Sequence, residues 1–123
     1  MRISLCIVGI ATTFQALCAR ECVVLVEAHP DDLGGHAGTA LLLSEKFDVK
    51  VVDFTRGEYG LGEEPYKDGS CARTRVKEEE NACAMLGTEP VFLGPVDYKG
   101  EKAFADEGVT RKLAELFKEW KPR

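Results

Sequence analysis

The chain has 123 residues, of which 45% are hydrophobic and 30% charged, and its 16 basic and 21 acidic side chains give a formal net charge of −5. This composition is that of one globular domain and excludes a disordered tail or a collagen-like fibre. The modest acidic balance also argues against an electrostatic grip on nucleic acid or on an anionic membrane. The expected partner is therefore a small molecule.

Residues 1–19 predict a targeting segment. Arg2 supplies a positive start, residues 3–17 are apolar apart from a few polar positions, and cleavage is expected near Ala19. The apolar run is too short for a membrane-spanning helix, which needs about 20 residues. The mature protein is then expected to lack a membrane span and to be secreted or periplasmic. The alternative, a buried strand at residues 3–10, would leave the protein cytoplasmic.

Five cysteines leave the compartment undefined. Cys6 and Cys18 fall in the expected leader, which leaves an odd number without a Cys-x-x-Cys pair. The remaining three are Cys22, Cys71 and Cys83. This pattern supports neither a disulfide framework nor a cysteine zinc site, and small packed thiols are the expected role.

After residue 20 the chain alternates between short β-branched runs and helical patterns, which is typical of βαβ units around a parallel sheet. Strands with the length and valine content of buried strands are predicted at residues 22–28, 49–55 and 90–93. Helices are predicted at residues 38–47, 72–86 and 109–120. The last helix is amphipathic, and its apolar face is expected to pack on the sheet. That face consists of Val109, Leu113, Leu116, Phe117 and Trp120.

The segment between the second strand and the second helix, residues 56–71, is predicted to be a loop. It contains four glycines, and Pro65 is expected to prevent a regular element from running through it. Loops of this length inside compact α/β domains are usually functional or mobile. The segment is therefore a candidate part of a functional site.

The sharpest motif, AHPDD at residues 28–32, follows the first predicted strand, where open α/β sheets bind their ligands. His29 and Asp32 offer an imidazole nitrogen and a carboxylate oxygen, which suit a zinc site with an open position. Asp31 is expected to point elsewhere and stay free, and a carboxylate beside such a site can act as general base. The competing interpretation is a helix cap, in which Asp32 accepts backbone N–H bonds.

Further motifs follow in order: Ala37-Gly38-Thr39, Thr55-Arg56-Gly57-Glu58, and Arg75-Val76-Lys77-Glu78 leading to Leu86-Gly87. Together with AHPDD they span about residues 22–94 and resemble the LmbE-like or PIG-L family of zinc-dependent N-acetylglucosaminyl deacetylases. The resemblance implies a Rossmann-like three-layer α/β/α sandwich with a mostly parallel sheet. It also implies Zn²⁺ as cofactor and an N-acetylated sugar or glycoconjugate as substrate.

The same resemblance assigns roles to individual residues. It makes His29 and Asp32 the zinc ligands and Asp31 the general base. Arg75 and Glu78 match the family's R-x-x-E helix, which lies near the site, and are expected to support it. The alternative for these two residues is an exposed ion pair on the helix surface, which contributes little stability.

Two departures from the family pattern stand out. Residues 33–36, Leu-Gly-Gly-His, occupy the place of an acidic residue near the paired aspartates, which leaves substrate orientation open. The family's third zinc ligand comes from a later His-x-x-His motif that does not occur before Arg123. His36 could stand in as a ligand, although a loop histidine bonded to water or backbone is the favoured interpretation.

This missing ligand predicts that residues 20–123 are the N-terminal part of a longer deacetylase domain, whose sheet is incomplete at the C-terminus. With two protein ligands, zinc affinity is expected to be weak and the fragment inactive by itself. A non-catalytic remnant or interaction module is the alternative. A nucleotide-binding domain is excluded, because two aspartates stand where a pyrophosphate needs glycine N–H groups and no G-x-G-x-x-G follows.

Overall fold

The structure is a computed structural model that describes residues 20–61, 63–94 and 106–123. Its elements in chain order are β1 (Cys22–Glu27), α1 (Asp32–Ser44), β2 (Asp48–Asp53), α2 (Glu63–Lys67), α3 (Ser70–Met85), β3 (Pro90–Phe92) and α5 (Glu107–Trp120). The predicted leader, residues 1–19, lies outside the described residues, and so do Cys6 and Cys18. The leader and the destination it implies therefore stay predictions.

The three strands form one parallel sheet in the order β1-β2-β3, which confirms the α/β class. Glu27 at the end of β1 is level with Asp53 at the end of β2, and Asp53 is level with Phe92 at the end of β3. Parallel strands need crossover connections, which run through α1 and α3. The carboxyl ends of all three strands consequently meet at one edge of the sheet.

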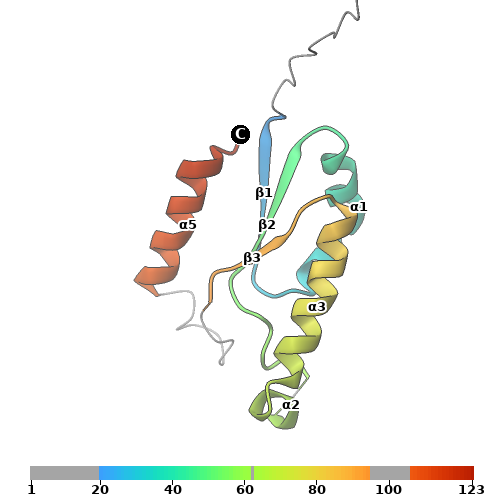
Figure 1. Cartoon of the computed structure of the whole chain (residues 1–123), viewed down its shortest axis with the longest axis vertical. Coiled ribbons are helices and arrows are strands. Elements are labelled where there is room, and N and C mark those ends of the chain that lie inside the picture. The colour runs from blue at the N-terminus through green and yellow to red at the C-terminus, as the bar shows by residue number, and fades with distance from the viewer. Residues whose placement is uncertain (1–19, 62, 95–105) are drawn as a thin grey trace, which may run out of the picture.

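Helices cover both faces of this sheet, as Figure 1 shows. On one face, Val51 of β2 packs in a core cluster with Leu33 and Ala40 of α1 and Cys83 of α3. The next residue, Val52, packs on the other face in a second cluster, which also contains residues of α5. Successive strand residues point to opposite faces, so two neighbouring valines serve two cores. The predicted three-layer arrangement is confirmed.

The predicted apolar face of the last helix also proves to be core. Val109 is buried, and Leu113, Leu116 and Trp120 pack against the same cluster, whereas Phe117 is 39% exposed. The helix begins where the Asp106 carboxylate accepts hydrogen bonds from the backbone of residues 108 and 109. A side-chain cap of this kind satisfies backbone N–H groups that have no partner inside the helix.

Helix α1 begins earlier than the sequence predicted, at Asp32 and not at Gly38. Its opening turn is rich in glycine, the weakest helix former after proline, which is why the pattern did not reveal it. The helix is interrupted at His36, whose backbone is non-helical (φ −136°, ψ 21°). The predicted segment therefore corresponds to the part of α1 beyond this interruption, and the helix ends at Ser44.

The prediction of a continuous loop over residues 56–71 is wrong in part, because α2 lies within it. Pro65 is in the first turn of α2, where proline is tolerated because the missing N–H has no acceptor inside the helix. The next helix, α3, ends close to its predicted position, and Gly87 beyond it has the left-handed φ of 73° that favours glycine.

The described cysteines behave as predicted. Cys22, Cys71 and Cys83 are buried and free. Within the described ranges, no helix is long and apolar enough to cross a membrane.

Candidate functional site

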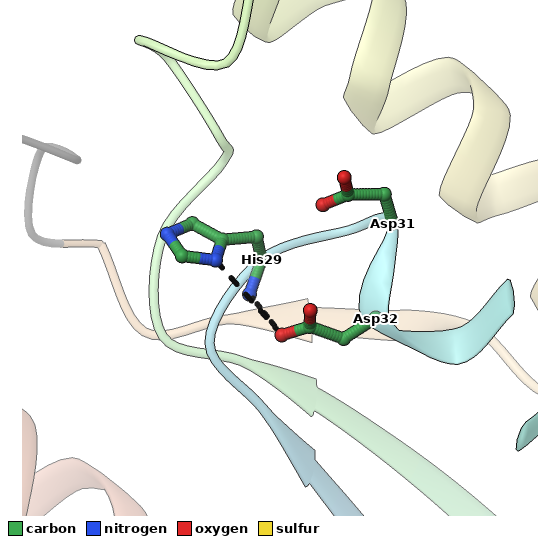
Figure 2. A group of neighbouring side chains, drawn as sticks. All are labelled: His29, Asp31 and Asp32. Carbon is green, nitrogen blue, oxygen red and sulfur yellow. Dashed lines mark hydrogen bonds and ion pairs between the residues drawn. The ribbon is translucent and has the colours of Figure 1, made fainter. Parts of the chain in front are cut away.

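The loop after β1 and the first residue of α1 carry the three residues that the sequence singled out, His29, Asp31 and Asp32 (Figure 2). One possible ligand atom from each lies within 4.8 Å of those of the other two. The histidine is partly buried and both aspartates are exposed. The structure therefore brings these side chains together as one group that could hold a metal ion, at the carboxyl edge of the sheet.

The Asp32 carboxylate is fixed by the loop that precedes it. Its Oδ2 atom accepts hydrogen bonds from the backbone N–H groups of Ala28 and His29, both at 3.0 Å, and lies 3.9 Å from Nδ1 of His29. The capping interpretation is thus correct in that Asp32 accepts backbone N–H bonds. It is wrong about the donors, because a helix cap binds N–H groups inside the helix, whereas Ala28 and His29 precede α1. All these contacts use Oδ2.

Asp31 does not stay free as predicted, because it pairs with Arg75 of α3. Nη1 of Arg75 donates to Oδ1 and Nη2 donates to Oδ2, both at 2.8 Å. These hydrogen bonds lower the pKa of Asp31. The positive charge of Arg75 also lowers it, whereas the partial burial of the carboxylate raises it. The carboxylate is therefore ionised at neutral pH, and its orientation is fixed by α3.

The loop after β2 closes over the Arg75 side chain. Gly57 has a left-handed φ of 63°, and a Cβ atom there would lie 2.8 Å from Cδ and Nη1 of Arg75. At Gly60 a Cβ atom would lie 2.6 Å from Cζ of Arg75. Thr55 ties this loop to the first one, because its hydroxyl accepts from the N–H of Gly57 and donates to the carbonyl of Ala28. The glycines thus make room for Arg75.

Arg75 and Glu78, predicted to support the site, lie in different settings. Burial alone would lower the pKa of Arg75, but the hydrogen bonds and charge of Asp31 raise it, with smaller contributions from Cys71 and Glu78. Arg75 therefore pairs across the fold and is no surface ion pair. Glu78 is exposed on α3 and acts on Arg75 through its charge.

Sequence reasoning missed a second acidic group directly inside the fold. Glu27, Asp53 and Glu79 are 5%, 0% and 1% exposed, and one carboxylate oxygen from each lies within 4.8 Å of the other two. The sequence did hold a signal for two of them, since an acidic residue ends each of two apolar strands. The contribution of α3 could not be read from the local pattern.

His36 belongs to this second group and is not a loop histidine. It lies in α1, where its Nε2 atom is 2.9 Å from Oε1 of Glu27. Its predicted role as a substitute ligand beside His29 has no support in this arrangement. The interruption of α1 at His36 coincides with its approach to a buried carboxylate.

Burial and mutual repulsion shift the pKa values of the buried acids upward. Desolvation, followed by the charges of Glu79 and Glu27, raises the pKa of Asp53 to about 8. Desolvation also raises the pKa of Glu79 to about 7, against a hydrogen bond donated by the thiol of Cys83. The pKa of Glu27 is raised by desolvation, although the charge of His36 opposes this shift.

The chain has an open parallel sheet with a histidine and two aspartates at its carboxyl edge. It is therefore an α/β domain with a candidate metal centre at the edge where such sheets bind their ligands. A family model described as PIG-L, GlcNAc-PI de-N-acetylase, matches residues 24–123, and the chain belongs to this family. The family predicted from the motifs is thereby confirmed, and its description supports a hydrolase of the deacetylase type. A search of the curated proteins finds no match to the chain.

Proposed function

We propose that the chain is a zinc-dependent hydrolase that deacetylates an N-acetylated sugar or glycoconjugate. The observation that carries this proposal is the gathering of His29, Asp31 and Asp32 at the edge of the sheet, in a member of a family described by a de-N-acetylase. An imidazole nitrogen and carboxylate oxygens are donors that Zn²⁺ prefers. The exposure of both aspartates leaves the group open to a substrate.

In this proposal His29 and Asp32 hold the metal. A zinc ion bound there supplies Lewis-acid activation of water and of the amide carbonyl. The backbone N–H groups of the loop orient Asp32 by binding Oδ2. His36 pairs with Glu27, so a third protein ligand has to come from outside the described residues. With His29 and Asp32 alone, we expect weak zinc binding and little activity.

Asp31 takes the proton from the attacking water in this proposal. Arg75 keeps its carboxylate ionised and orients it through two hydrogen bonds. Each carboxylate oxygen can accept a further hydrogen bond beyond the one from Arg75, so the pair does not block this role. Arg75 is then a positioning residue, which acts on the reaction through Asp31.

The Asp31→Asn variant tests the assignment of the base. In a protein that also supplies the third zinc ligand, we expect kcat for an N-acetylglucosamine conjugate, measured with zinc in excess, to fall by about 10²- to 10⁴-fold, because proton transfer to a side chain contributes that much. Zinc affinity should stay close to that of the wild type. Asp32→Asn should lose zinc and activity together.

Asp48→Asn is a matched control, because Asp48 is an exposed aspartate at the start of β2, at the opposite end of the strands. It should leave both zinc affinity and activity unchanged. Loss of zinc in Asp31→Asn would move Asp31 into the ligand set. Glycoconjugate binding without any turnover, in a wild-type protein that also carries the third ligand, would favour the non-catalytic alternative, in which the Arg75 pair merely closes the loop.

A further inference from the structure

The buried acidic group, formed by Glu27, Asp53 and Glu79, contains none of the residues assigned to hydrolysis, although the charge of Asp32 acts on it. The first two are register partners at the ends of β1 and β2, and the third comes from α3, which packs on the same face of the sheet. Three elements thus direct carboxylates to one point. Their oxygens lie within 4.8 Å of one another.

This convergence is costly unless something compensates the charge. Ionised carboxylates lose their hydration on burial, and neighbouring ones repel each other. The charges that act on Asp53 are those of Glu79, Glu27 and Asp32, all of them acidic. Within the described part of the chain, the histidine beside Glu27 is the group in contact with these carboxylates that could carry a positive charge. One imidazolium cannot neutralise three carboxylates.

Some oxygens of this group also lack partners. Among the described residues, neither carboxylate oxygen of Asp53 has a hydrogen-bond partner. Glu27 differs, because its Oε1 atom lies 2.9 Å from Nε2 of His36 and the backbone of Leu33 lowers its pKa. Buried polar groups in native proteins are almost always satisfied by protein, water or an ion. The two buried oxygens of Asp53, which have no hydrogen-bond partner, therefore indicate a missing partner with positive charge at this point.

The donor set identifies the chemistry of that partner. It offers carboxylate oxygens, which are the ligands of the hard cations Mg²⁺, Ca²⁺ and Mn²⁺, whereas the first group combines an imidazole with carboxylates. Oxygens that all lie within 4.8 Å of one another are close enough to bind one such cation together.

We propose that Glu27, Asp53 and Glu79 bind one hard divalent cation, at a second site beneath the loop that carries His29. The cation joins β1, β2 and α3 through their carboxylates. It compensates the charge that would otherwise be buried uncompensated at the carboxyl edge of the sheet. This site is independent of zinc binding by His29 and Asp32, and its ligands take no part in the proposed hydrolysis.

Mn²⁺ binding to the chelator-treated full chain tests this proposal, measured by calorimetry and by loss of the free-ion electron paramagnetic resonance signal. Asp53→Asn and Glu79→Gln should weaken the Mn²⁺ Kd by at least about tenfold, since even outer-shell changes at metal sites cost about 10- to 100-fold. His29→Ala should keep the site. Glu80→Gln is a matched control, because Glu80 is the exposed neighbour of Glu79 on α3.

Thermal denaturation in the presence of a chelator shows whether a variant that fails to bind metal is still folded. At a pH above the pKa of about 8 of Asp53, Asp53→Asn and Glu79→Gln should melt at or above the wild-type Tm without metal, because each then removes an uncompensated buried charge. Added Mn²⁺ or Ca²⁺ should raise the Tm of the wild type, and should not raise that of these two variants. Wild-type Mn²⁺ affinity in Glu79→Gln, or loss of all binding in His29→Ala, would overturn the proposal. A Tm that responds to no divalent cation would show that protons neutralise the group, and would also overturn it.

Discussion

Arg75 is the single side chain on which the orientation of Asp31 depends. Its guanidinium binds both oxygens of that carboxylate, and this bidentate geometry is specific to arginine. Asp31 is exposed, whereas Arg75 is mostly buried. Because water screens the exposed carboxylate, this ion pair contributes only modestly to stability. Its importance lies in the position and ionisation of the candidate base.

The Arg75→Lys variant should lower kcat/KM for the deacetylation by about 10- to 100-fold, because a lysine cannot hold both oxygens. The pH profile gives the more specific test. If the reaction needs ionised Asp31, activity is lost as the pH falls through the pKa of Asp31. Arg75 lowers that pKa. The substitution should therefore move the acidic limb of the profile to higher pH. An unchanged limb with a lower plateau would contradict the role of Arg75 in ionising Asp31.

At the scale of elements, the loop between β2 and α2 is shaped by what it encloses. Gly57 has a left-handed backbone, and both Gly57 and Gly60 lie too close to the Arg75 side chain for a Cβ atom. The free thiol of Cys71, at the start of α3, donates to the carbonyl of Gly57 and ties the loop to the helix. The loop therefore acts as a support for the site.

Gly57→Ala should reduce the free energy of unfolding by about 1–3 kcal/mol, because alanine is strained at positive φ and its methyl group would meet Arg75. Gly38→Ala is the matched control, since it lies in α1 with open space around it. The control should gain about 0.5–1 kcal/mol from better helix propensity. Urea denaturation measures both changes. Equal stability of the two variants would mean that the loop does not close on Arg75.

Two hydrophobic cores, one on each face of the three-stranded sheet, hold the described part of the molecule together. Val51 faces α1 and α3, and Val52 faces α5, and both are fully buried. Helix α5 is thus an integral layer, and its loss would expose one face of the sheet. The candidate site lies at the edge where both cores end, so its geometry depends on both.

Val51→Ala and Val52→Ala should each reduce the free energy of unfolding by about 2 kcal/mol, because each removes buried methyl groups from a packed core. Val26→Ala is the control from the same sheet, since Val26 is 43% exposed, and it should cost less than half as much. Chemical denaturation gives the three values. A Val52 variant as stable as the Val26 variant would show that α5 does not cover the sheet in solution.

The sequence alone determined the order and type of the main elements, the parallel sheet, the family and the three residues of the candidate metal group. These rest on local information: valine-rich runs, the helical period of α5, the glycine that ends α3, and the contiguous AHPDD string. Where local signals were weak, the prediction failed. The glycine-rich start of α1 and the short α2 around Pro65 are the two cases.

Only the tertiary structure decided which distant side chains meet. Asp31 and Arg75 are 44 residues apart, and no local pattern states that α3 lies over the first loop. The buried group likewise needs the register that aligns Glu27 with Asp53 and the packing that adds Glu79. Such contacts depend on how whole elements pack. Periodicity and propensity describe each helix or strand separately. Whether a charged side chain is compensated depends instead on which side chains from other elements lie beside it in space.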